Sequence, residues 1–244
     1  MSFNPRRLII TACLALCLGA FAVPVQADEQ GRRILDAMDR AMNLEEGRMR
    51  IRIEDHKSGG TARVFAAEVL YVLKTATLIE FVDPPRDRGK RILTVGDSMW
   101  MSVPGTSRPI RLSGRDAFMG TSFTNDDVMN LDRSDDYDAQ VDGQEAGGTR
   151  LVLTARRTSL PYPRMEMLVG ADSLPVWTVL YTRSGAASRR IEYGAPKDFG
   201  DRVRPSVMTL IDLMARGDRS IVIFESMQAS RVDRARLSPA SFGR

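Results

Sequence analysis

The side chains of this 244-residue chain that could perform chemistry do not form a complete catalytic set. Ser98, Ser102 and Ser113 are candidate nucleophiles, but a serine nucleophile needs a base such as histidine. His56 is the only histidine, and it lies in a polar run at residues 55–60 that predicts an exposed turn. A metal site needs several converging ligands. We therefore expect neither a catalytic nor a metal-binding role for His56.

Two pairs of adjacent carboxylates, Asp126-Asp127 and Asp135-Asp136, are the remaining candidates for acid–base or glycosidic chemistry. Adjacent side chains on a helix or a strand point apart, so neither pair is suited to work on one substrate bond. Negative charge at a helix N-terminus and a solvated turn explain them better. The sequence also has no Walker-type phosphate loop and no dinucleotide-binding fingerprint. We predict a protein that is not an enzyme, with no catalytic residue, no bound metal and no cofactor.

The composition argues against a nucleic-acid partner. The chain has 35 basic and 31 acidic residues, a formal net charge of +4, and its basic residues are interspersed with acidic ones. Nucleic-acid-binding proteins carry a basic stripe or a recognisable motif, and this sequence has neither. Its 13 methionines instead suit a surface that adapts to varied apolar shapes.

The N-terminus has the pattern of a cleavable export signal. Arg6-Arg7 precedes an uncharged apolar run over residues 8–23, and Val25-Gln26-Ala27 fits a signal-peptidase site. We expect cleavage after Ala27 and a periplasmic mature protein that begins at Asp28. The apolar run is shorter than the roughly 20 residues of a membrane-spanning helix, so an uncleaved anchor is the weaker alternative.

A second alternative is a lipoprotein, because Ile10-Thr11-Ala12-Cys13 resembles a lipidation site. The apolar stretch before it would then be too short for an export signal. Cys13 and Cys17 are the only cysteines, and both lie in the expected signal. The mature chain would therefore contain no disulfide and no thiol nucleophile.

The hydrophobic periodicity changes from helical to strand-like early in the chain. Residues 28–43 have apolar positions at helical spacing, and residues 48–54 alternate strictly between polar and apolar. A short helix is expected after Thr124, which would cap it. The segment at residues 237–242 looks like a docking tail. The predicted strands are 48–54, 62–73, 75–82, 91–95, 99–103, 108–112, 137–141, 149–156, 164–169, 175–182, 188–199, 203–215 and 219–229.

This pattern predicts a mainly β fold in one domain over residues 28–244. No alternation of strands and helices points to a parallel sheet, and the turns, among them Asp142-Gly143, separate strands at short intervals. One large, strongly curved antiparallel sheet is the economical arrangement. Such a sheet closes into a barrel or wraps around something, and the two helices would plug or cover its concave side.

Residues 81–131 resemble a known family. The matching stretches are FVDPPRDRGKRIL at 81–93, DSMWMSVP at 97–104, Arg111, GTSFT at 120–124 and Asp126-Asp127. They are similar to the outer-membrane lipoprotein-sorting, or LolA-like, family, and most of all to its uncharacterised branch. The resemblance implies a half-open antiparallel barrel with helices as a lid over an apolar cavity. It further implies a lipid ligand, either the acyl chains of a lipoprotein or a free lipid.

The implied function is a periplasmic carrier or chaperone, with an inner-membrane transporter and an outer-membrane acceptor as possible partners. The lid arginine of the founding carrier matches no residue of this sequence. Trp100, Phe118, Met119 and Phe123 lie beside glycines and turns, where the mouth of a barrel would be, and we expect them to bind the ligand. Packing of the core is the alternative role for these four side chains. The alternative function is a sensor or structural partner of an envelope complex that binds a protein segment.

Overall fold

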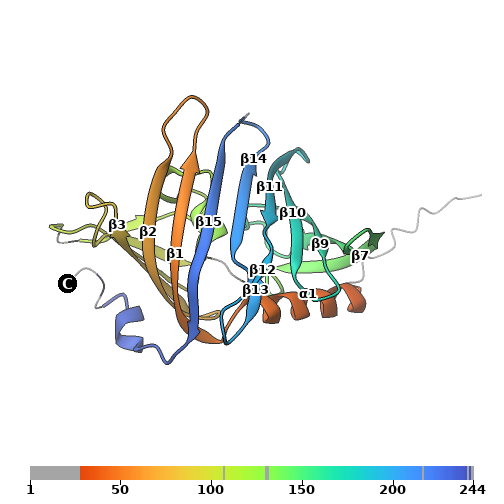
Figure 1. Ribbon diagram of the computed structural model, residues 1–244, viewed down its shortest axis with the longest axis horizontal. Helices are drawn as coiled ribbons and strands as arrows, with labels where there is room; N and C mark the ends of the chain where they lie inside the picture. The colour runs from red at the N-terminus through yellow and green to blue at the C-terminus, as the bar shows by residue number, and fades with distance from the viewer. Residues whose placement is uncertain (1–27, 107, 130–131, 216, 241, 243–244) are drawn as a thin grey trace, which may run out of the picture.

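The structure is a computed structural model that describes residues 28–106, 108–129, 132–215, 217–240 and 242, so the expected signal segment lies outside the described residues. Within these ranges, 13 strands pair in a single antiparallel sheet in the order β6-β5-β4-β3-β2-β1-β15-β14-β11-β10-β9-β8-β7 (Figure 1). The edge strands β6 and β7 do not pair with each other, so the curved sheet stays open. The prediction of a mainly β, half-open antiparallel fold is confirmed.

The elements of the first half are α1 (Glu29–Met42), β1 (Glu46–His56), β2 (Arg63–Val72), β3 (Ala76–Asp83), β4 (Arg91–Val95), β5 (Ser98–Ser102), β6 (Ile110–Leu112), η1 (Phe118–Gly120) and α2 (Asn125–Met129). Those of the second half are β7 (Tyr137–Glu145), β8 (Gly148–Ala155), β9 (Arg164–Val169), β10 (Pro175–Tyr181), β11 (Ala187–Tyr193), β12 (Pro196–Asp198), β13 (Val203–Pro205), β14 (Val207–Asp212), β15 (Arg219–Ala229) and η2 (Arg234–Leu237). Strands β12 and β13 form a separate two-stranded hairpin.

Alternation along β1 shows how the sequence specifies the two faces of the sheet. Met49, Ile51 and Ile53 are buried on the concave face. Arg50, on the opposite face, forms ion pairs with glutamates of both neighbouring strands. A one-residue slip would exchange the two faces, so the buried apolar side chains hold the register.

Helix α1 covers the open edge of the sheet at β7. The Asp28 carboxylate caps the helix by accepting from Gln30 N at 2.9 Å, and it also accepts from Val141 N of β7 at 3.1 Å. Gly31 allows this close approach, because a Cβ there would lie 2.7 Å from Ala139 O. The helix predicted at residues 28–43 is therefore confirmed, and it shields an otherwise unpaired strand edge.

Two arginines from the β12–β13 hairpin hold the C-terminal end of α1. Arg204 Nη1 donates to Met42 O at 2.7 Å, and Arg202 donates to Arg40 O. Arg204 is only 2% exposed and its guanidinium lies 4.2 Å from the centre of the Phe224 ring. Burial lowers the pKa of Arg204 to about 10. A cation at the negative end of the helix dipole offsets part of this burial cost.

The apolar interior consists of two clusters on opposite faces of the sheet. The larger cluster joins α1, the lid residues described below and the concave face of the strands. In the smaller one, Val232, Leu237 and Phe242 pack against Leu78 and Leu93 on the convex face. The prediction that the tail docks on the sheet is confirmed.

Three sequence predictions need correction. Asp142-Gly143 is not a turn, because β7 continues to Glu145 through an irregularity between Val141 and Gly143. His56 does not lie in an exposed turn but ends β1, opposite Arg219. The strands predicted at 188–199 and 203–215 are each divided in two, since the β12–β13 hairpin turns away from the main sheet to reach α1. No helix in the described part of the chain is long and apolar enough to span a membrane.

Candidate functional site

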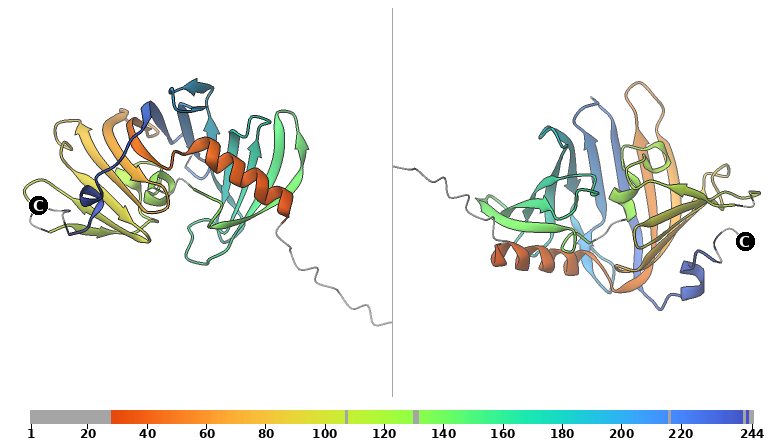
Figure 2. Two further views of the ribbon diagram at one scale, coloured as in Figure 1. Left: turned by 90° about the horizontal axis from the view of Figure 1, so that it is seen from below. Right: turned by 180° about the vertical axis from the view of Figure 1, so that it is seen from behind.

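Residues 113–129, here called the lid segment, lie inside the curve of the sheet. Figure 2 shows this yellow-green segment on the concave side of the strands at the N-terminal end of the sheet, with α1 across the other half. The lid segment contains η1 and α2. The η1 end is hydrogen-bonded to β2 and β15. The α2 end is hydrogen-bonded to Tyr162 and to β11.

The η1 end of the lid segment is an anchor. Phe118 is fully buried, and its ring centre lies 5.9 Å from that of Phe81. Arg63 Nη2 donates to Gly120 O at 2.7 Å, and Ser122 N donates to Ser220 Oγ at 2.9 Å. These contacts fasten η1 to strands on both sides of β1.

The buried Asp55 carboxylate supports this anchor, accepting from Ser220 Oγ at 2.7 Å and from Arg63 Nη2 at 2.6 Å. Lys57 Nζ donates to Ser122 Oγ at 3.0 Å, which brings a serine and a lysine together. Lys57 Nζ is also 3.2 Å from the Asp218 carboxylate. These contacts hold the anchor in place.

Helix α2 begins with a reciprocal cap. Asp127 N donates to Thr124 Oγ1 at 3.2 Å, while Thr124 N donates to Asp127 Oδ2 at 2.7 Å. Each side chain thus satisfies a backbone N–H of the first turn that has no partner within the helix. The predicted cap at Thr124 is confirmed.

Asp127 also joins α2 to the second half of the sheet. Its Oδ2 accepts from Arg189 Nη1 of β11 and from Tyr162 Oη, both at 3.2 Å, and Arg189 donates to the same Tyr162 hydroxyl. Burial, followed by the charge of Asp127, raises the pKa of Tyr162, so its hydroxyl remains a donor. We call Asp127, Tyr162 and Arg189 the latch.

A small apolar cavity lies between α2 and the concave face. Its volume is about 30 Å³. This is room for about one water molecule, and not for an acyl chain while α2 is in this position. The lining residues are Met49, Ile51, Val69, Thr77, Ile79, Phe123, Asp127, Val128, Met208, Val222 and Phe224.

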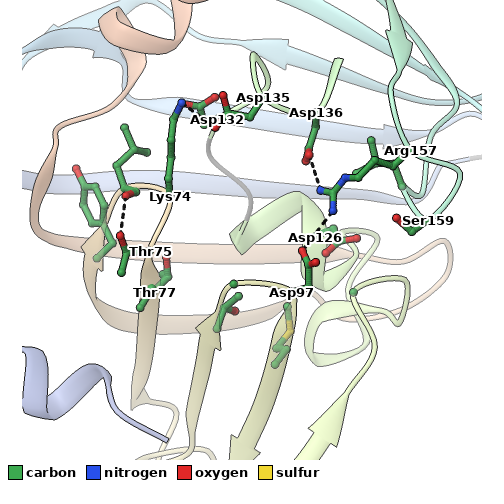
Figure 3. Close-up of a pocket in the computed structure, with 18 of the residues that line it drawn as sticks. Lys74, Thr75, Thr77, Asp97, Asp126, Asp132, Asp135, Asp136, Arg157 and Ser159 are labelled. Carbon is green, nitrogen blue, oxygen red and sulfur yellow. Dashed lines mark hydrogen bonds and ion pairs between the residues drawn. The ribbon is translucent and has the colours of Figure 1, made fainter. Parts of the chain in front are cut away.

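A larger, polar cleft of about 490 Å³ adjoins this cavity (Figure 3). Its charged side chains are mostly paired: Lys74 Nζ lies 2.8 Å from Asp135, and Arg157 pairs with Asp136. Thr77 lines both the cleft and the apolar cavity, so the two hollows meet at this residue.

Helix α2 presents its two acidic residues to different surroundings. Asp126 lines the polar cleft and Asp127 lines the apolar cavity, as expected for adjacent helical residues. Burial and then the charge of Asp127 raise the pKa of Asp126. Gly114 makes room for it, since a Cβ there would lie 2.1 Å from Asp126 Oδ1.

A buried pair of carboxyl groups links α1 to the chain that follows the lid segment. Asp39 Oδ2 accepts from Arg133 N at 2.9 Å and from Ser134 N at 2.8 Å, whereas its Oδ1 has no donor among the described residues. Burial and the adjacent Asp132 raise the pKa of Asp39 to about 7. Burial opposes the opposite shift at Asp132, but hydrogen bonds from Asp39 and Ser134 and the charge of Lys74 lower its pKa. A proton on Asp39, shared with Asp132, satisfies both groups.

The four residues predicted to bind a ligand are not all in one place. Phe118, Met119 and Phe123 belong to the cluster on the concave face, and Phe123 lines the apolar cavity. Trp100 packs in the cluster on the convex face, because Met99 takes the inward position of β5. Trp100 is therefore not part of the site. A ligand-binding role for the other three stays a prediction.

The latch is not predicted from the sequence. The residue types explain Asp127 only as negative charge at a helix terminus, and they assign no role to Arg189 or Tyr162. One signal was available for Arg189: it is two residues from the buried Ile191, and period-two alternation places both on the inward face of β11. No group of three or more potential metal ligands occurs in the described ranges.

Comparisons with known proteins agree with this architecture. The profile of a family described as uncharacterized proteins matches residues 74–244, and the chain belongs to this family. No curated protein matches the sequence. A LolA superfamily protein from Nitrosomonas europaea has a TM-score of 0.78 at 20% identity, over 86% of this chain and 98% of its own.

Two further solved structures have the same fold. A DUF1329 family protein from Desulfovibrio piger has a TM-score of 0.80 at 17% identity, over 88% of this chain and 98% of its own. A domain described as a candidate outer-membrane lipoprotein-sorting protein, from Vibrio parahaemolyticus, has a TM-score of 0.76 at 16% identity, over 88% and 99%. The resemblance to the LolA-like fold, predicted from residues 81–131, is thereby confirmed.

Proposed function

We propose that this protein is a non-enzymatic lipid carrier of the bacterial envelope, which holds an apolar chain between its sheet and α2. The observation that supports this function is the apolar cavity on the concave face, closed by a short helix that the latch ties to the second half of the sheet. Lipoprotein acyl chains and free lipid are the two ligand classes that fit such a surface. The shared fold with lipoprotein-sorting proteins supports the same class.

The cavity wall suits a flexible apolar ligand. Methionines such as Met49 and Met208 have unbranched side chains that adapt to different shapes. Each methylene buried there contributes about 0.8 kcal/mol. A chain of about ten methylenes would gain roughly 8 kcal/mol before the costs of association are subtracted.

Loading requires α2 to move outwards, because the closed cavity of about 30 Å³ is too small for a chain. The anchor at Phe118 and Ser122 would stay in place, while α2 separates from Arg189 and Tyr162. A charged headgroup attached beyond the apolar chain would then lie in the cleft beyond Thr77, a residue that lines both the cleft and the cavity.

The test is binding of dansyl-labelled undecanoic acid together with mass spectrometry of lipids extracted from the purified protein. Val128→Asp places a second carboxylate in the cavity beside Asp127, and its desolvation should weaken probe binding at least about tenfold. Val176→Asp, on the exposed surface of β10, is the matched control and should bind as the wild type does. Absence of both extracted lipid and probe binding in the wild type would contradict the carrier function.

The small volume of the closed cavity favours a second candidate, an envelope sensor or structural partner that binds a protein segment. This candidate predicts a protein that purifies without lipid and does not bind the dansyl probe. Pull-down of envelope proteins after cross-linking in cells would then recover a specific polypeptide. Lipid in the purified protein excludes it as the main function.

We further propose that the mature chain works in the periplasm, between an inner-membrane donor and an outer-membrane acceptor. The charged and apolar pattern of residues 1–27 supports export. Intact-mass analysis of the exported protein should give a chain that begins at Asp28. A diacylated mass that begins at Cys13 would replace this proposal with the lipoprotein alternative.

A further inference from the structure

One carboxylate oxygen of the latch has no hydrogen-bond partner among the described residues, and its residue lines the apolar cavity. The Asp127 side chain is 1% exposed and lines the cavity. Three donors, Thr124 N, Tyr162 Oη and Arg189 Nη1, converge on its Oδ2. Its Oδ1 has no hydrogen-bond partner among the described residues.

The other residues that line the cavity provide almost no hydrogen-bond donor for this oxygen. Apart from Asp127 and Thr77, every lining side chain is apolar. A buried charged oxygen without a donor is costly, and native proteins retain few such atoms. Oδ2 alone is enough for the latch and the helix cap. Oδ1 is therefore an acceptor that the closed protein does not use.

We propose that Asp127 Oδ1 accepts a hydrogen bond from the ligand, so that the cavity selects an apolar chain bearing an N–H or O–H donor. This inference rests on the proposed carrier function and specifies the ligand. A chain attached through a secondary amide, or one that ends in a hydroxyl, has the required donor. A plain ester or ether of the same length does not.

Matched probes test the donor directly. N-methyldodecanamide has one N–H, and N,N-dimethyldodecanamide has none; dodecanol and dodecyl methyl ether form the second pair. The first pair represents the amide of an acylated polypeptide terminus, and the second represents a hydroxyl lipid. Displacement of dansyl-labelled undecanoic acid should show the donor member of at least one pair binding about tenfold more tightly, the scale of a hydrogen bond to a charged group. The pair in which the donor member has the greater advantage in affinity shows whether the ligand is an acylated polypeptide or a hydroxyl lipid.

Asp127→Asn separates hydrogen bonding from size. The Asn oxygen must keep facing Thr124 N, the cap donor that moves together with α2, so the amide N–H₂ turns to the cavity and offers a donor instead of an acceptor. The preference for donor probes should disappear or reverse. Asp116→Asn, in an exposed part of the same lid segment, is the control and should keep the wild-type ratio.

The outcomes are distinct. Equal affinities within each pair in the wild type overturn the inference and leave the carrier function standing. A preference that persists in Asp127→Asn is steric and also overturns it. Failure of every probe to bind the wild type rejects the carrier function and the inference with it. If Asp127→Asn does not fold, the wild-type ratios alone decide.

Discussion

Arg189 Nη1 lies 3.2 Å from Asp127 Oδ2, and this ion pair joins β11 to α2 across the concave face of the sheet. Both side chains are largely removed from water, since Asp127 is 1% exposed and Arg189 22%. A buried charge that loses its partner is strongly destabilising, whereas an exposed pair contributes little. We therefore expect the position of α2 to depend strongly on this arginine from a distant strand.

Arg189→Gln should lower the free energy of unfolding by about 3 kcal/mol, because it removes the cation that is hydrogen-bonded to the buried Asp127 carboxylate. Amide hydrogen exchange in α2 should also become faster than in the anchor at residues 118–122. Arg190→Gln is the control: Arg190 points to the other face, pairs with the exposed Glu192, and should change stability by less than about 1 kcal/mol. Equal effects of the two substitutions would rule out the latch.

Stability should fall as the pH rises towards 7, through Asp39. Its pKa is raised from the ordinary 3.8 to about 7, so the folded protein keeps the proton that the unfolded chain releases. The stabilisation is complete below the unfolded pKa and is lost as the pH rises through the folded pKa. At about 1.4 kcal/mol per pKa unit, the loss is on the order of 4 kcal/mol.

Asp39→Asn should remove this dependence, since its oxygen still accepts from Arg133 N and Ser134 N while its N–H₂ donates to Asp132. Thermal unfolding should give similar Tm values for wild type and Asp39→Asn at pH 4, and a higher Tm for the variant at pH 8.5. Asp36→Asn, on the partly exposed face of α1 beside Arg32, should keep the wild-type slope. Parallel slopes for wild type and Asp39→Asn would show that Asp39 is ionised in the folded protein.

Gly31→Ala should destabilise the protein, although alanine normally favours a helix over glycine by about 1 kcal/mol. The new Cβ would lie 2.7 Å from Ala139 O, so α1 must move off the edge of β7. Overpacking of this kind costs roughly 1–3 kcal/mol and exceeds the gain. Gln30→Ala, on the exposed side of the same turn, should be nearly neutral. Chemical denaturation measures both, and a stabilising Gly31→Ala would show that α1 does not pack tightly on β7.

Much of the fold follows from local patterns in the sequence. The bounds of β4, β9 and β15 coincide with the predicted ranges, because each has alternating or apolar residues between clear turns. The pairing of β1 with β15 could not be predicted, since it joins the first strand to the last and no local signal encodes it. The predicted position of Trp100 was wrong for a different reason. Met99, Trp100 and Met101 are all apolar, so the alternation of residue types does not indicate which of them face inwards.

The site was harder to predict than the fold. The cap at Thr124 is a short-range feature and was found from residue types alone. The latch joins residues separated by 62 positions in the chain, and only the curvature of the sheet brings Arg189 to Asp127. The family resemblance predicted a lid over a cavity. It did not indicate that Phe123 lines the cavity whereas Phe118 packs in the core.

Two buried phenylalanines of the lid segment allow the cavity to be tested independently of the latch. Phe118 and Phe123 are 0% and 1% exposed, so replacing either by alanine should cost roughly 3–5 kcal/mol. Only Phe123 lines the apolar cavity, whereas Phe118 packs against Phe81. Phe123→Ala should therefore enlarge the existing hollow, and Phe118→Ala should open a separate space behind the anchor.

The two variants should differ in ligand binding despite their similar stability. If outward movement of α2 limits loading, extra space beneath it should let dansyl-labelled undecanoic acid associate several-fold faster with Phe123→Ala than with the wild type. Phe118→Ala should not gain this advantage, because its new space does not join the cavity. Stopped-flow fluorescence, at a temperature where thermal unfolding shows both variants folded, measures the rates. Equal acceleration in both would mean that general loosening, rather than the cavity at Phe123, controls access of the chain.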